Sequence, residues 1–84
     1  MPLTVLAVEI PRTGERVLIA RTPEIQMEVW AAHNAALDLI ELFTSLTDPE
    51  PIGIGAARTS RTARDLARMF LREMEPDDEP YFFY

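Results

Sequence analysis

Apolar residues near the start of the chain form two short runs separated by a polar link. Residues 3–10, LTVLAVEI, and residues 16–21, RVLIAR, are rich in β-branched and aliphatic side chains, as strands are. The link PRTGER contains Gly14, which readily adopts the left-handed backbone conformation that turns require. The pattern therefore predicts an N-terminal β-hairpin.

The first predicted strand is apolar on both faces. Its apolar residues divide into two sets, which are Leu3, Val5 and Ala7 on one face and Leu6, Val8 and Ile10 on the other. A sheet with two apolar faces needs cover on both. Because 84 residues supply few covering elements, we expect a second copy of the chain to cover one face.

The next segment has the start signals of a helix. Thr22 is a suitable N-cap, Pro23 fits the first helical position, and Glu24 is an acid in the first turn. A period of 3.6 residues then continues to about Leu46. The predicted apolar stripe consists of Ile25, Val29, Ala32, Ala36, Leu39, Ile40 and Phe43.

Two large apolar residues of this predicted helix, Trp30 and Leu37, fall outside the stripe. A Trp in such a place is typical of a second contact surface, although it also fits over a neighbouring strand. We interpret both residues as candidates for partner binding.

The predicted helix ends in a break at residues 47–57, TDPEPIGIGAA, which holds two prolines and two glycines. Thr59 or Ser60 is a suitable N-cap for a second helix that runs to about Met74. The predicted apolar face of this helix consists of Ala63, Leu66, Ala67, Phe70 and Met74.

The predicted fold class is therefore α+β, with an N-terminal β-hairpin followed by two helices in the order ββαα. A short third strand is possible at residues 52–56 or in the C-terminal tail. We expect one small domain over residues 1–76 and an acidic, aromatic tail over residues 77–84.

Composition restricts the available chemistry. The chain is 48% hydrophobic and 26% charged, which indicates a globular protein. It has no cysteine, which excludes disulfides, thiolate metal ligands and cysteine nucleophiles. No apolar run approaches the roughly 20 residues of a membrane span, and no signal peptide is evident. We expect a cytoplasmic protein with no membrane partner.

Charge is arranged in blocks, although the net charge is −6. Residues 22–51 hold six acids and no base, and residues 73–79 hold five acids. Between them, residues 58–72 hold five arginines and one acid. The arginines recur every three or four residues, opposite the predicted apolar face, and are Arg58, Arg61, Arg64, Arg68 and Arg72.

Like charges at this spacing repel one another in a helix, so the arginine stripe fits a surface that meets something acidic. The alternative is an ordinary solvated face. Acidic candidates include the tail, a second copy of the chain, an acidic partner and a phosphate backbone.

The C-terminal tail, EPDDEPYFFY, combines acids with a run of aromatic residues. Its candidate partner-binding residues are Asp77, Asp78, Tyr81, Phe82, Phe83 and Tyr84. The aromatic residues either dock on the same domain or form a short motif that a partner recognises.

No catalytic set is evident. His33 is the only histidine, and no serine, threonine or lysine stands beside a suitable base. We therefore expect no enzyme activity, no cofactor and no metal site. The leading hypothesis is a homo-oligomeric module that binds and regulates another, unidentified protein. The alternative is a regulator that binds nucleic acid through the arginine stripe.

Overall fold

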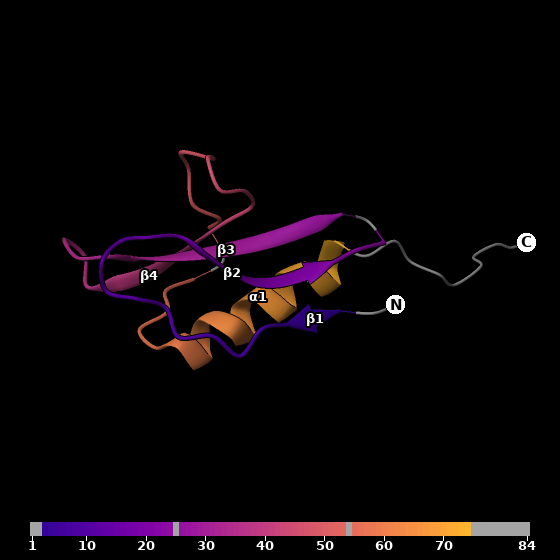
Figure 1. The fold of residues 1–84 in the computed structure, drawn as a ribbon, viewed down its shortest axis with the longest axis horizontal. Coiled ribbons are helices and arrows are strands. Elements are labelled where there is room, and N and C mark those ends of the chain that lie inside the picture. The colour runs from indigo at the N-terminus through magenta and orange to yellow at the C-terminus, as the bar shows by residue number, and fades with distance from the viewer. Residues whose placement is uncertain (1–2, 25, 54, 75–84) are drawn as a thin grey trace, which may run out of the picture.

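The computed structural model describes residues 3–24, 26–53 and 55–74. This part of the chain forms a four-stranded antiparallel sheet in the order β1-β2-β3-β4, with one helix against it (Figure 1). The elements are β1 (Thr4–Val5), β2 (Val17–Thr22), β3 (Met27–Asn34), β4 (Leu39–Phe43) and α1 (Ser60–Met74). Helix α1 contacts β2, β3 and β4, so it covers one face of the sheet.

The predicted ββαα arrangement is wrong. The segment from residue 22 to residue 46, predicted as a helix, instead supplies the β3–β4 hairpin, so the element order is ββββα. Strand β3 has a period of two, because Val29 and Ala31 are buried with the core while Trp30 points to the opposite face. Cross-strand packing of β-branched and aromatic side chains has outweighed the helix propensity of this segment.

The Thr22–Pro23 pair, predicted as a helix start, belongs to the β2–β3 turn. Thr22 is the last residue of β2 and is completely buried. The backbone NH of Gln26 donates to the carbonyl of Pro23 at 3.2 Å, and Gln26 has a left-handed φ of 55°. The chain therefore reverses where an N-cap would have continued it into a helix.

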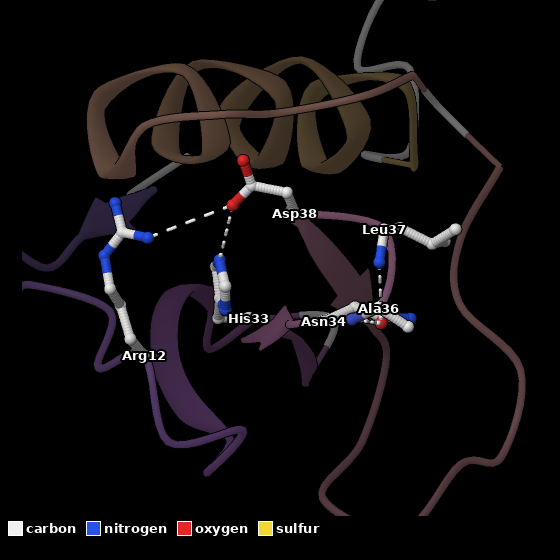
Figure 2. Close-up of polar contacts among 6 residues, drawn as sticks. All are labelled: Arg12, His33, Asn34, Ala36, Leu37 and Asp38. Carbon is white, nitrogen blue, oxygen red and sulfur yellow. Dashed lines mark hydrogen bonds and ion pairs between the residues drawn. The ribbon is translucent and has the colours of Figure 1, made fainter.

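The β3–β4 turn is fixed by an asparagine at its start (Figure 2). The Oδ1 of Asn34 accepts hydrogen bonds from the backbone NH of Ala36 at 3.0 Å and of Leu37 at 3.3 Å. Asp38 then takes a left-handed φ of 53°, a conformation that aspartate tolerates better than most residues. The turn chemistry of Asn34 and Asp38 explains why Ala35 to Leu37 do not continue a helix.

The predicted pairing of the first two strands is present, but β1 is short. Thr4 pairs with Arg21, and the backbone NH of Leu6 donates to the carbonyl of Ile19 at 2.8 Å. Gly14, in the connection, has the left-handed φ of 88° that was expected of it. The rest of the connection lies beside the end of the sheet that carries the β3–β4 turn (Figure 1).

A bulge in β2 directs two consecutive side chains into the core. The register shifts between Leu18 and Ala20, so Ile19 is the extra residue opposite β3. Both Ile19 and Ala20 are completely buried in the core cluster. Two residues on one strand therefore occupy the place of one on its neighbour, as in a bulge.

Residues 52–56, predicted as a possible strand, form no strand in the described part of the chain. The segment instead lines the edge of β4 through isolated bonds. The NH of Ile52 donates to the carbonyl of Leu42 at 2.6 Å. The NH of Ile40 donates to the carbonyl of Ala57 at 2.7 Å. These bonds satisfy two backbone groups at an edge that would otherwise invite further strands.

Helix α1 confirms the second predicted helix. Thr59 is the N-cap, because its Oγ1 accepts from the backbone NH of Thr62 at 3.1 Å. Ala63, Ala67 and Leu71 are completely buried against the sheet. The predicted apolar face is correct in part. Leu66 and Phe70 are half-buried, Met74 is exposed, and the buried Leu71 was not among its members.

Candidate functional site

The sheet face turned away from α1 carries a row of three large apolar side chains. Leu18 on β2 pairs with Trp30 on β3, and Trp30 pairs with Phe43 on β4. Directly paired residues of an antiparallel sheet lie on the same face, with Cβ atoms about 4.5–5.5 Å apart. The neighbouring pairs, Val17–Ala31 and Ala31–Leu42, belong to the core side. We call Leu18, Trp30 and Phe43 the apolar row.

Two polar side chains hold the apolar row in place. The guanidinium of Arg16 lies 3.6 Å from the ring centroid of Phe43, and its Nη1 donates to the carbonyl of Ser45 at 2.9 Å. The indole Nε1 of Trp30 donates to Oε1 of Glu28 at 3.2 Å. Phe43 is buried, with Arg16 over its ring, whereas Trp30 is half-buried. The rings are therefore fixed in orientation while the row keeps contact with solvent.

A hollow of about 360 Å³ adjoins the row at the end of the sheet with the β3–β4 turn. Its floor includes the small side chain of Ala32, and its walls include Arg16, Phe43 and residues 12–14. Asn34 Nδ2 donates to Oε1 of Glu41 at 3.1 Å, which orients the carboxylate at its rim. The outer face is therefore concave at this end of the sheet and not flat.

On the opposite side of β3, a second polar group surrounds His33 (Figure 2). Nε2 of His33 lies 3.4 Å from Oδ1 of Asp38, and Nη1 of Arg12 lies 3.9 Å from the same oxygen. The side chain of His33 is 12% exposed, while those of Arg12 and Asp38 are largely exposed. The carboxylate of Asp38 follows His33 by five residues in the chain.

The geometry of His33 does not suit general base catalysis. A catalytic His–carboxylate pair uses one ring nitrogen for the carboxylate and presents the other to the substrate. In His33 the other nitrogen, Nδ1, is buried, with no hydrogen-bond partner in the described part of the chain. The His33–Asp38 contact therefore links β3 to the turn and leaves no nitrogen open for a reacting group.

Four of the five stripe arginines lie on the flank of α1, and Arg58 precedes the helix. The sequence had placed the stripe opposite the buried face. Arg64 is half-buried, and its Nη1 donates to the carbonyl of Val8 at 2.8 Å. Nη1 of Arg68 lies 3.1 Å from Oδ1 of Asp65 in the preceding turn. The stripe members with exposed side chains are Arg58, Arg61 and Arg72.

The structure separates the other predicted site residues. Trp30 is in the apolar row on the outer face, whereas Leu37 is at the tip of the β3–β4 turn and 59% exposed. The tail residues Asp77, Asp78 and Tyr81 to Tyr84 lie outside the described residues. Trp30 and the arginine stripe belong to opposite sides of the sheet.

Three residues of this site were missed from the sequence, namely Arg16, Leu18 and Phe43. Leu18 was assigned to a strand without a face, and Phe43 was placed in the core stripe of a helix. Neither residues 39–43, LIELF, nor residues 27–32, MEVWAA, alternate cleanly between apolar and polar side chains. The shared face of Phe43 and Trp30 follows only from the register of β3 and β4.

Within the part of the chain that the structure describes, no group of three or more metal-ligating side chains is suitably placed for an ion. Its helix is also not long and apolar enough to cross a bilayer. Comparison of the chain with protein-family models, with curated proteins and with solved structures finds no match.

Proposed function

We propose that the protein is a non-enzymatic protein-binding module that acts in the cytoplasm and uses the outer face of its sheet as the contact surface. One observation carries the proposal. The apolar row crosses three strands of a face over which no helix or strand of the described residues packs. An antiparallel sheet commonly leaves one face exposed to solvent, and the side chains on that face are then polar. The outer face of this sheet carries the apolar side chains of Leu18 and Trp30 instead.

The composition of the outer face supports a protein partner. Interface centres are enriched in aromatic residues and arginine, and their charged groups gather at the rim. Trp30 lies on the inner strand β3 with Phe43 beside it on β4, and Arg16, Arg21 and Glu28 lie next to them. Since Trp30 and Phe43 are already oriented by Glu28 and Arg16, little side-chain entropy remains to be lost on binding.

A nucleic-acid-binding regulator is the alternative, and it has less support. Binding to a phosphate backbone requires several free cationic groups on one surface. Of the five stripe arginines, Arg64 donates to the carbonyl of Val8 and Arg68 pairs with Asp65. A net charge of −6 adds long-range repulsion from a polyanion.

Site-specific photo-cross-linking tests the proposed function. A photoreactive residue at Leu18, on the outer face, should capture protein in living host cells. The same residue at Met69, which is 59% exposed on α1, is the matched control and should capture far less. Equal capture at both positions, or none at Leu18, would contradict the proposal. The adduct mass also separates a second copy of this 9.5 kDa chain from a different protein.

A further inference from the structure

We infer that the outer face of the sheet binds a second copy of this chain, face to face, about a twofold axis parallel to the strands. This inference rests on the proposed function and names its partner. The observation behind it is how charge is distributed around the apolar row.

Positive and negative side chains on the outer face belong to different strands. Arg21 on β2 pairs with Glu28 on β3, which is two residues from Trp30 and so on the same face. Glu41 is on β4, two residues before Phe43, and so is also on this face. Arg16 precedes β2 in the chain, but its guanidinium lies over Phe43 on β4. The opposite charges that lie side by side across β2 and β3 are therefore Arg21 and Glu28.

A twofold axis along the strands matches these charges. Placed between β2 and β3, it brings β2 of one copy over β3 of the other. Arg21 then meets Glu28 of the second copy, and Leu18 meets its Trp30. Both contacts occur twice, since a twofold interface uses the same patch on each copy. Face-to-face sheets that pack in this aligned way keep their strands within about 30° of each other.

Other arrangements of two copies lose this match. A twofold axis perpendicular to the strands would place β2 over β2, so that Arg21 of one copy would not face Glu28 of the other. A contact through the flank of α1 would bring the exposed Arg61 and Arg72 toward their own counterparts. Like charges that face each other across an interface disfavour association. With the axis parallel to the strands, the apolar row is covered and each Arg21 faces Glu28 of the other copy.

The segment between β4 and α1 fits beside such a dimer. It rises from the sheet on the side away from α1 (Figure 1). It carries Leu46, which is 57% exposed. In the dimer, the segment of each copy would stand at the β1 edge of the other.

Two charge-reversal variants test the inference, Arg21→Glu and Glu28→Arg. Each alone gives positions 21 and 28 the same sign, so that like charges face each other across the interface and self-association should weaken about tenfold or more. An equimolar mixture of the two should restore it as a mixed dimer, because two acids of the first variant then face two arginines of the second. Sedimentation equilibrium and native mass spectrometry measure both effects. Arg72→Glu, the matched reversal on α1, should leave self-association unchanged.

The mixture is decisive because each variant has lost the Arg21–Glu28 pair within its own chain. Mixing cannot restore that pair, so recovery reports a contact between copies. A monomeric wild-type chain, or no recovery on mixing, overturns the inference. If Leu18 still cross-links to a different protein in that case, the proposed function stands. If deletion of residues 80–84 exposes Trp30 of a monomer to acrylamide quenching, the chain's own tail is the occupant and the dimer is wrong.

Discussion

Asp38 occupies a backbone conformation that most side chains avoid. Its φ of 53° is left-handed, and its carboxylate lies 3.4 Å from Nε2 of His33. A residue with a Cβ loses about 1–2 kcal/mol in this conformation, and glycine does not. The position therefore combines a backbone requirement with a side-chain contact, and substitutions can separate the two.

We predict that Asp38→Gly is more stable than Asp38→Ala by about 0.5–1 kcal/mol. Both variants lose the carboxylate, so the difference reports the backbone alone. The figure is below the full left-handed cost because glycine also gains entropy in the unfolded chain. Urea unfolding followed by the fluorescence of Trp30, the only tryptophan, measures it. Equal stability of the two variants would show that the turn does not need a left-handed residue there.

At the scale of elements, Arg64 connects α1 to the segment that follows β1. Its Nη1 donates to the carbonyl of Val8, and Ile10 NH donates nearby to Oγ of Ser60 at 3.1 Å. These two bonds therefore hold the segment after β1 against the helix. Arg64, which the sequence predicted to be part of a contact surface, therefore also stabilises the fold.

We predict that Arg64→Ala destabilises the fold by about 1–2 kcal/mol, since a half-buried carbonyl loses a charged donor. Arg61→Ala on the same helix is the matched control. Arg61 is exposed, so its loss should change stability by less than about 0.5 kcal/mol. Thermal unfolding of both variants by circular dichroism gives the comparison. Similar melting temperatures for the two variants would contradict a structural role for Arg64 and would indicate a solvated side chain.

The elements differed in how much of their structure could be read from the sequence. Helix α1 was predicted with its bounds, because Thr59 is a local cap and the break before it is rich in proline and glycine. The β3–β4 hairpin was not predicted, because its apolar positions fit a period of 3.6 as well as a period of two, and Ala35 to Leu37 favour a helix.

The local signal that could have resolved this ambiguity was Asn34 followed by Asp38. An Asx turn and a left-handed aspartate together reverse the chain, whereas both residues are weak helix formers. The same error hid the site. Trp30 was recognised as a contact residue, but its neighbours Leu18 and Phe43 become neighbours only through strand register.

At the scale of the whole molecule, the two sides of the sheet differ in character. One side is closed by α1, with small buried residues such as Ala63 and Ala67 that let helix and sheet approach closely. The other carries the apolar row with charges of both signs around it. The cationic flank of α1 is distant from that row, so assembly through the sheet leaves the flank available for an acidic segment.

The chain supplies such a segment after Met74. Residues 77–79 are acidic and residues 81–84 are aromatic, and both lie outside the described residues. We predict that the aromatic residues are docked, and that deletion of residues 80–84 lowers the melting temperature or the oligomer mass. Each well-buried ring contributes about 1.5–3 kcal/mol. Since 1 kcal/mol shifts the melting temperature of a small domain by roughly 4–8 °C, we expect a decrease of at least about 5 °C.

Two controls separate docking of the rings from loss of chain length or charge. Replacing residues 81–84 with serine keeps the length and the acids, and it should lower the melting temperature as much as the deletion does. Neutralising Asp77 and Asp78 to asparagine should have a smaller effect that weakens further in salt, because exposed ion pairs contribute about 0–1 kcal/mol. A deletion variant with unchanged melting temperature and mass would favour a tail that is free in the isolated protein. The aromatic residues would then be better explained as a motif for a separate partner.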